Sequence, residues 1–399
     1  MRSNKLIERV VEGSEAVALA VKACRPEVIS SFPISPQTHI VEALARMVAE
    51  GDLASEYVAV DSEFSAASVI SGASAAGSRA YTASTSQGLL LMTEVIYASA
   101  GMRLPFVLTG VNRAISAPIS IQPDNQDAMS LRDSGILQFY VESCQEAYDM
   151  HLAAFKIAED PGICLPVMIC MDGWILTHSY ERVKFLAQSE VDSFLPSFKP
   201  KNFLDVENPK SWGPIADEDL YMEFRFSVHD AMEKGKKRIN EVLSELHELT
   251  GRDHGGLIEK YRTEGADIVF VAMGSIAGTT KDAVDDLISE GKSAGLIKLR
   301  CFRPFPYEEL IDALRGIKAA VILDSNISMS SEGAISLDLK SKLYGMPDPP
   351  IVFSVIAGLG GKVVNKNTIY ELFNKAEKMC HSKVHPSESY WMDLNHSVL

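Results

Sequence analysis

The chain has 399 residues, of which 46% are hydrophobic and 23% are charged. This composition supports large apolar cores and excludes a disordered chain, a collagen and a small disulfide scaffold. Lysine and arginine number 38 against 53 aspartates and glutamates, so the formal net charge is −15. We expect no nucleic-acid partner and no membrane-surface contact, because both are bound through clustered positive charge.

The six cysteines contain no C-x-x-C pair. The sequence therefore predicts neither a zinc site nor an iron–sulfur cluster held by this chain alone. Charges are scattered through the first residues where a signal peptide would have an apolar core, and no later run reaches about 18 apolar residues. We expect a cytoplasmic protein.

Short apolar runs alternate with helical patterns over residues 12–177. The runs are rich in β-branched residues and predict buried parallel strands at residues 27–34, 56–60, 78–85, 104–111 and 164–171. The segments between them predict helices at residues 36–51, 63–77, 87–102 and 145–160. Regular alternation of this kind predicts an α/β domain with a doubly wound parallel sheet and helices on both faces.

A proline-rich connector begins near residue 178 and leads to apolar residues at helical spacing from Val228 to Leu249. We interpret this stretch as a linking helix packed on the body, with a partner-binding helix as the alternative. The β/α alternation then restarts at residue 266. The sequence predicts two domains, residues 1–250 and residues 251–399, and the second is a smaller α/β domain.

The first strand leads into a turn in which Ser35 lies between Pro33 and Pro36. Prolines restrict the backbone and withhold N–H groups, so they hold a rigid turn at the carboxyl end of the strand, where open α/β sheets bind ligands. The Ser35 hydroxyl is positioned to contact a substrate. A helix cap or turn without a ligand is the alternative.

Glu63 opens the helix predicted at residues 63–77, which consists almost wholly of small residues. A carboxylate in the first turn of a helix is favoured electrostatically, so a capping role is one interpretation. The small side chains also imply that another surface packs closely here. Such packing would desolvate Glu63 and raise its proton affinity, as a proton relay requires.

Two further turns follow strands of the predicted sheet. Residues 85–88 form a polar Thr-Ser-Gln-Gly turn. Arg113 lies just after the strand at residues 104–111, beside a long polar segment at residues 115–135. An arginine at this edge is suited to bind a carboxylate through two hydrogen bonds, and the polar segment could act as a lid over it. A surface ion pair is the alternative role for Arg113. The motifs of dinucleotide sites, P-loops, zinc proteases and serine hydrolases are absent.

Several long motifs stand in one order along the chain: FPISPQTHIVEAL, DSEFSAASVISGASAAGSRAYTASTSQGLLLM, LPFVLTGVNRAISAPISI, PVMICMDGWILTH and GLGGK. In these motifs the chain resembles the alpha subunit of the 2-oxoacid:ferredoxin oxidoreductases, most closely of those that act on pyruvate. The resemblance implies a sheet of the thiamine diphosphate pyrimidine-binding type, followed by a transketolase C-terminal-like domain.

The same resemblance implies a role for each candidate residue. Glu63 matches the glutamate that hydrogen-bonds the cofactor's aminopyrimidine, and Arg113 matches the arginine that binds the 2-oxoacid carboxylate. Ser35 stands where the usual P-I-T-P pattern has threonine and keeps the hydroxyl, while Pro33 shapes a backbone carbonyl that faces the cofactor's amino group. The loop at residues 122–127 lacks the histidine of the N-D-H-S-D run found in many relatives.

A G-D-G…N motif for magnesium and diphosphate is absent from the chain. The resemblance implies that a beta subunit supplies Mg²⁺, the diphosphate site and a [4Fe-4S] cluster, and that gamma and delta subunits complete the complex with further clusters. The complex would convert pyruvate reversibly to acetyl-CoA and CO₂, with coenzyme A as co-substrate and ferredoxin as electron acceptor. The alternatives are a branched-chain, 2-oxoglutarate or oxalate oxidoreductase, or a non-catalytic assembly subunit.

Overall fold

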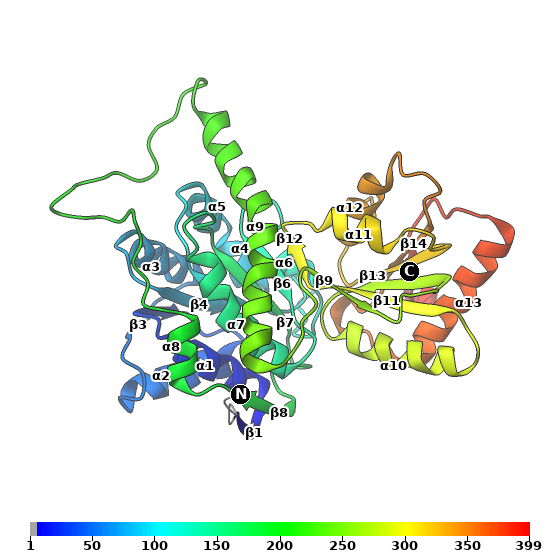
Figure 1. Cartoon of the computed structure of the whole chain (residues 1–399), viewed down its shortest axis with the longest axis horizontal. Coiled ribbons are helices and arrows are strands. Elements are labelled where there is room, and N and C mark those ends of the chain that lie inside the picture. Colours follow the sequence, from blue (N-terminus) through cyan, green and yellow to red (C-terminus); the bar gives the residue numbers. More distant parts are fainter. Residues whose placement is uncertain (1–5) are drawn as a thin grey trace.

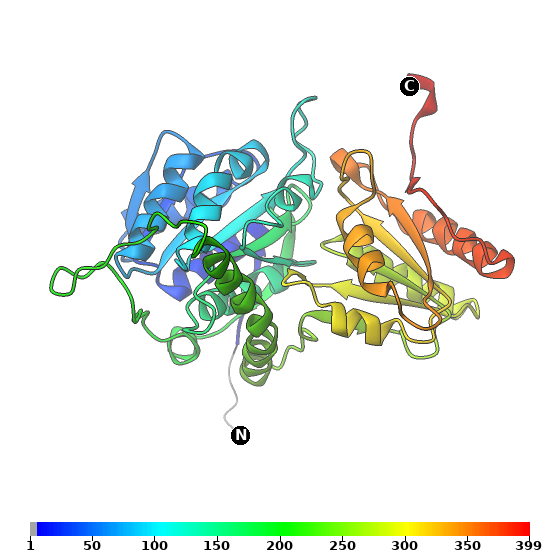
Figure 2. The ribbon, with the colours of Figure 1, turned by 90° about the horizontal axis from the view of Figure 1, so that it is seen from above.

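A computed structural model of the chain describes residues 6–399. Residues 1–5 lie outside the described residues. They include the start of the predicted first domain and of the stretch considered for a signal peptide. Figures 1 and 2 show two α/β bodies side by side, with the long helix α9 (Tyr221–Thr250) along the first of them. Among residues 6–399, no helix is both long and apolar enough to cross a bilayer.

The first body is built on a seven-stranded sheet with the strand order β12-β6-β7-β5-β4-β2-β3. Its strands are β2 (Val28–Ser31), β3 (Glu56–Ala59), β4 (Ala80–Ser84), β5 (Val107–Asn112), β6 (Leu137–Tyr140), β7 (Val167–Asp172) and β12 (Cys301–Arg303). Neighbours pair in parallel except β12, which is antiparallel to β6. Each of the five strands predicted for this region is present, whereas the short β6 was not predicted.

Helices cover both faces of this sheet, so the predicted doubly wound α/β class is confirmed. One face carries α1 (Gly13–Cys24), α2 (Thr38–Ala49) and α7 (Cys144–Ala158). The other carries α3 (Glu63–Ala75), α4 (Ser86–Leu91), α5 (Thr93–Gly101) and α6 (Gln126–Met129). Side chains of successive strand residues reach opposite faces: Tyr81 belongs to the first core and Ala80 to the second.

The connector region adds a small sheet and two helices. Strand β1 (Ile7–Glu12) pairs antiparallel with β8 (Tyr180–Phe185), and α8 (Gln188–Phe194) follows. Helix α9 packs on the body through Val228, Ile239, Val242 and Leu246, and it ends at Gly251, which adopts the left-handed conformation that glycine favours. The predicted packed helix is thus present, but its first turns project and leave Tyr221, Met222, Phe224 and Phe226 exposed.

The second body has a six-stranded sheet with the order β15-β14-β13-β10-β11-β9, in which only β9 is antiparallel. Its strands are β9 (Ile258–Tyr261), β10 (Ile268–Ala272), β11 (Ala294–Leu299), β13 (Ala319–Asp324), β14 (Ile351–Ile356) and β15 (Tyr390–Trp391). Its helices are α10 (Ile276–Ser289), α11 (Tyr307–Ala313), α12 (Ala334–Leu343) and α13 (Lys366–Ser382), with short 3-10 turns at Leu359–Gly361 and His396–Val398. One apolar core extends from α3 and α5 of the first body to α12 of the second.

The segment after residue 294 belongs to both bodies. β11 lies in the second sheet, whereas β12 joins the edge of the first sheet beside β6. Arg300 stands between the two strands, and its buried guanidinium donates to Glu146 Oε1 of α7 at 2.6 Å. Lys298 donates to Oε2 of the same carboxylate at 2.7 Å, so a buried ion cluster joins the two bodies.

We predict that Glu146→Gln destabilises the fold by about 3–5 kcal/mol, because it leaves two buried cations without their central carboxylate. The neighbouring cations Lys298 and Arg300 lower the pKa of Glu146 against the opposing effect of burial. The stability that ionised Glu146 gives to the fold is therefore fully present above the pKa of unfolded glutamate, about 4.3. This stability is lost as the pH falls below that value. Urea unfolding at several pH values measures the difference in the free energy of unfolding between the variant and the wild type. Glu248→Gln, an exposed position on α9, is the control, and equal stability of both variants would contradict the prediction.

Candidate active site at the carboxyl edge of the first sheet

Glu63 is the first residue of α3, directly after the turn that follows β3. The helix is capped by Ser62, whose hydroxyl accepts from the backbone N–H of Ser65 at 3.2 Å, so the helix does not depend on Glu63 as its cap. The Glu63 side chain is buried, with 7% of its surface exposed, and its carboxylate has no hydrogen-bond partner within residues 6–399. The side chain is therefore held within the body, while its carboxylate keeps its hydrogen-bonding capacity for a ligand.

Gly88, the third residue of α4, lies close against Glu63. A Cβ atom at this position would lie 2.7 Å from Glu63 Cγ, 2.8 Å from Glu63 Oε1 and 2.4 Å from Ser84 Oγ. These distances are shorter than normal van der Waals contacts, so a side chain at position 88 would displace Glu63 or Ser84. The small residue therefore brings the strand-to-helix turn and the carboxylate into one site.

Arg113 connects the other predicted positions. Its Nη1 donates to the Ser35 carbonyl oxygen at 2.6 Å, and its Nη2 donates to Gln87 Oε1 at 2.7 Å. Burial lowers the pKa of Arg113, and the nearby carboxylates of Asp127 and Glu63 act in the opposite direction. The carboxyl edge of the sheet thus brings together Ser35, Glu63, Gln87 and Arg113, as their positions in the turns predicted. Arg113 does not form a surface ion pair.

Asp127 organises this edge, and the sequence analysis did not single it out. Its fully buried carboxylate accepts from the backbone N–H groups of Ser86 at 2.8 Å and Arg113 at 3.0 Å, and from Asn112 Nδ2 at 2.8 Å. Burial raises the pKa of Asp127 to about 7, although these donors lower it. The carboxylate holds two strand-to-helix turns in one arrangement, and only its place in the QPDNQD loop marked it in the sequence.

Ser35 and Pro33 lie on the exposed rim of the site. The Ser35 hydroxyl makes no hydrogen bond among the described residues, so it is free to meet a ligand, while its carbonyl is used by Arg113. The buried Gln37 supports this turn from below, donating from Nε2 to the carbonyl of Ala83 at 2.7 Å. Gln37 is a second positioning residue that the sequence analysis missed, because a glutamine after a turn carries no distinct signal.

The loop at residues 122–127 meets the second body. Asp124 Oδ2 accepts from the Gly360 N–H at 3.0 Å, and the Asn125 N–H donates to the Ser325 carbonyl at 2.8 Å. Asp172, at the end of β7, accepts from the Ser275 N–H at 2.8 Å. The GLGG segment, which the sequence left without a role, therefore helps to hold the loop that carries Asp127.

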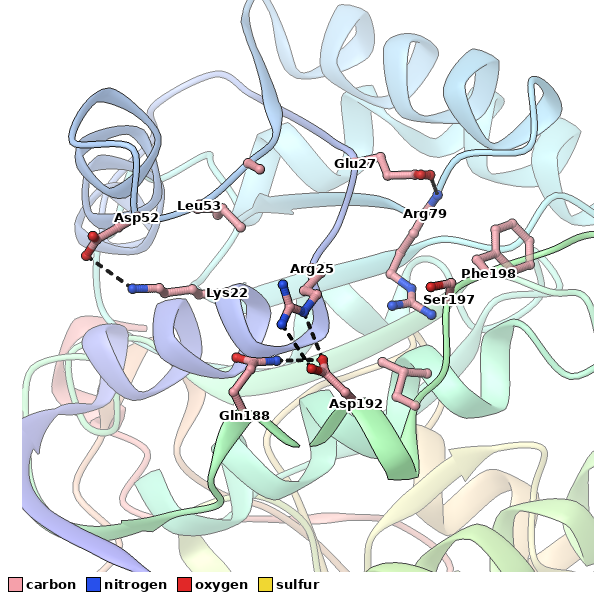
Figure 3. Close-up of a pocket in the computed structure, with 12 residues that line it drawn as sticks. Lys22, Arg25, Glu27, Asp52, Leu53, Arg79, Gln188, Asp192, Ser197 and Phe198 are labelled. Atoms are coloured by element: carbon pink, nitrogen blue, oxygen red, sulfur yellow. Dashed lines mark hydrogen bonds and ion pairs between the residues drawn. The ribbon is translucent and has the colours of Figure 1, made fainter. Parts of the chain in front are cut away.

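A separate cavity of about 550 Å³ opens at the opposite, amino edge of the first sheet (Figure 3). Its arginines already have partners. Arg25 forms two hydrogen bonds with Asp192 at 2.8 and 2.9 Å, and Arg79 forms two with Glu159 at 2.6 and 2.7 Å. Because these guanidinium groups serve the fold, we place the candidate active site at the carboxyl edge and not in this cavity.

Comparison with known proteins identifies the family. The model of the family described as "Pyruvate flavodoxin/ferredoxin oxidoreductase, thiamine diP-bdg" matches residues 19–244, and that of "Pyruvate:ferredoxin oxidoreductase core domain II" matches residues 266–369. The chain is 48% identical to pyruvate synthase subunit PorA of Methanosarcina barkeri, over 98% of this chain and 97% of the relative. It is 41% identical to ketoisovalerate oxidoreductase subunit VorA of Pyrococcus abyssi, over 98% of both chains.

Solved structures share the fold. A 2-oxoglutarate:ferredoxin oxidoreductase from Magnetococcus marinus matches with a TM-score of 0.71 at 18% identity, over 94% of this chain and 66% of that one. A split-gene transketolase matches with a TM-score of 0.55 at 14% identity, over 93% of this chain and 99% of that one. The family models and the curated relatives together define a subunit of a thiamine diphosphate-dependent oxidoreductase. The chain belongs to the pyruvate flavodoxin/ferredoxin oxidoreductase family, which confirms the resemblance seen in the sequence.

The residues at the carboxyl edge fit part of thiamine diphosphate. Besides the unpartnered Glu63 carboxylate, buried polar atoms without partners gather here: Ser84 Oγ, Thr85 Oγ1, Gln87 Nε2 and Arg113 Nε. Buried polar atoms are rarely left unsatisfied in native proteins, so this group has the chemistry of a site completed by a polar ligand. These atoms and the glycine at position 88 can receive a polar, planar ring.

We predict that Gly88→Ala destabilises the chain by about 1–3 kcal/mol, because the added methyl group overlaps Glu63 and Ser84. Gly72→Ala is a matched control on the neighbouring α3, since a Cβ there meets nothing within 4 Å. Alanine is a better helix former than glycine, so this control is expected to stabilise the chain by up to about 1 kcal/mol. Chemical unfolding of both variants measures the difference, and the same sign for both would disprove the close approach at position 88.

Proposed function

We propose that this chain is the alpha subunit of a pyruvate:ferredoxin oxidoreductase, with Glu63, Arg113, Ser35 and Pro33 as its site residues. The observation that carries the proposal is the buried Glu63 carboxylate, which has no partner within residues 6–399 and lies against Gly88 beside Arg113. The pyruvate synthase subunits at 42–48% identity support pyruvate as the substrate.

When bound, thiamine diphosphate supplies a nucleophilic thiazolium carbon and an electron sink for decarboxylation. Glu63 would hold the aminopyrimidine by accepting a hydrogen bond at its carboxylate, with the Pro33 carbonyl facing the ring's amino group. The Glu63 side chain is buried against Gly88, so this hydrogen bond would form with little competition from bulk water.

Arg113 would bind the carboxylate of the 2-oxoacid. Its Nε is buried without a partner, while Nη1 and Nη2 are held by Ser35 and Gln87, so the guanidinium plane is fixed before substrate binds. A positioned cation of this kind binds a carboxylate with little loss of side-chain entropy. The neighbouring Ser35 hydroxyl is free to donate to the 2-oxo or carboxylate oxygen.

The proposed enzyme is active only as a complex. A beta subunit would supply Mg²⁺, the diphosphate site and a [4Fe-4S] cluster, and gamma and delta subunits would carry further clusters to ferredoxin, with coenzyme A as co-substrate. Two exposed features support contact with other subunits: Phe64 and Gly72 on the open face of α3, and the projecting start of α9. Cytoplasmic location stays a prediction.

We predict that Glu63→Gln lowers kcat of the assembled complex by roughly 10²- to 10⁴-fold, because an amide cannot accept the proton that the carboxylate would accept. Steady-state turnover with pyruvate, coenzyme A and a low-potential acceptor measures it, and size-exclusion chromatography checks assembly. Glu94→Gln, on the exposed face of α5, is the control. Turnover near that of the wild type in Glu63→Gln would refute the assigned role.

We predict that Arg113→Ala raises KM for the 2-oxoacid about tenfold or more, in keeping with the loss of a charge-assisted hydrogen bond. KM for coenzyme A is expected to change much less, because coenzyme A does not depend on this carboxylate contact. Initial rates with each substrate varied in turn measure the split. An equal rise in both KM values would contradict a carboxylate-binding role.

A branched-chain 2-oxoacid is the second candidate substrate, because the ketoisovalerate oxidoreductase subunit covers the same length at 41% identity. A substrate panel on the complex, including 2-oxoglutarate and oxalate, distinguishes the candidates. A preference for pyruvate supports the proposal, and a preference for any other acid overturns it in favour of that substrate.

A further inference from the structure

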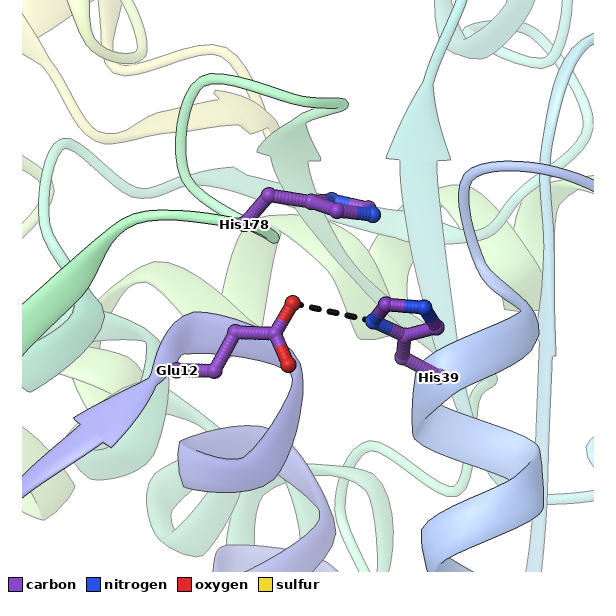
Figure 4. A group of neighbouring side chains, drawn as sticks. All are labelled: Glu12, His39 and His178. Atoms are coloured by element: carbon purple, nitrogen blue, oxygen red, sulfur yellow. Dashed lines mark hydrogen bonds and ion pairs between the residues drawn. The ribbon is translucent and has the colours of Figure 1, made fainter.

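Three possible metal ligands from separate segments meet beside the candidate active site, and none of them has a role in the proposed function (Figure 4). Glu12 ends β1, His39 lies in the first turn of α2, and His178 lies in the loop between β7 and β8. One ligand atom of each residue lies within 4.8 Å of the others. Residues 12, 39 and 178 are far apart in the sequence, so only the tertiary fold brings them together.

Each side chain is held in place by its surroundings. The His178 ring contacts the Trp174 ring, with a centroid distance of 4.4 Å, and the His39 ring, with a centroid distance of 4.6 Å. Thr177 Oγ1 lies 2.7 Å from His178 Nδ1, which leaves Nε2 without a partner among the described residues. An imidazole oriented through one nitrogen, with the other nitrogen free, is typical of a metal ligand.

Glu12 is turned toward this point and away from its own helix. It occupies the N-cap position of α1, yet its side chain makes no capping hydrogen bond there. Its Oε1 lies 2.9 Å from His39 Nδ1, and its side chain is 17% exposed while that of His39 is 49% exposed. The Glu12–His39 pair does not involve His178, whereas a metal ion would be bound by all three side chains.

We propose that Glu12, His39 and His178 form a binding site for one divalent transition-metal ion of the Zn²⁺ type. Two imidazoles and one carboxylate are a known zinc ligand set in sites that keep an open position. The exposed side of His39 leaves room for water in the remaining position. Mg²⁺ and Ca²⁺ prefer oxygen ligands, so this site is chemically distinct from the Mg²⁺ expected with thiamine diphosphate.

A bound ion would join the start of α1, the start of α2 and the loop after β7. That loop also contacts the polar segment after Arg113, because Trp174 Nε1 donates to the Ile121 carbonyl at 2.6 Å. The ion would thus stabilise the rim of the candidate active site.

The test is a titration of the purified, chelator-treated full chain with Co²⁺, which reports its ligands by visible absorption. We expect one Co²⁺ per chain with d–d bands and no thiolate charge-transfer band. His178→Ala and Glu12→Gln are expected to weaken binding more than about 100-fold, since even outer partners of a metal ligand contribute 10- to 100-fold. His381→Ala, an exposed histidine on α13, is the control and should bind as the wild type does.

A second measurement does not depend on the spectrum. Zn²⁺ is expected to raise the Tm of the wild type and of His381→Ala, and not that of His39→Ala, because a ligand that binds only the folded state stabilises it. Mg²⁺ at the same concentration should leave Tm unchanged. Binding of Co²⁺ by His178→Ala as tight as that by the wild type, or a spectrum dominated by thiolate charge transfer, would overturn the proposal.

Discussion

The buried carboxylate of Asp127 determines how the candidate active site is built. Its oxygens accept hydrogen bonds from the backbone of Ser86, the backbone of Arg113 and the side chain of Asn112. Two loops after neighbouring strands would otherwise leave these donors unsatisfied inside the protein, at a cost of about 1–3 kcal/mol each. The carboxylate accepts hydrogen bonds from all three donors. The segment that carries Gln87 and the strand end that carries Arg113 are therefore fixed relative to each other.

Asp127 in turn depends on contact between the two bodies. Asp124 and Asn125, which precede it, bond to the backbone at Gly360 and Ser325 of the second body. The Glu146 ion cluster and strand β12 hold the same two bodies together on another side. The second domain therefore supports the first domain's site without contributing a candidate catalytic group of its own.

The site at the carboxyl edge keeps free hydrogen-bonding capacity. Glu63 is buried but unpartnered, and the polar atoms around Arg113 are only partly satisfied. Folding within this chain thus prepares a carboxylate and a guanidinium, and leaves their remaining hydrogen-bonding capacity to a ligand.

The sequence by itself determined the fold class, five strands of the first sheet and the turns that carry Ser35, Glu63 and Arg113. These features follow from local patterns: buried parallel strands are continuous apolar runs, and their carboxyl ends share one edge of the sheet. Only the tertiary structure decided that residues 294–305 divide between two sheets, that Asp127 and Gln37 support the site, and that Glu12, His39 and His178 meet. Each of these depends on contacts between residues distant in the sequence, and hydrophobic periodicity carries no information about which distant polar groups will satisfy one another.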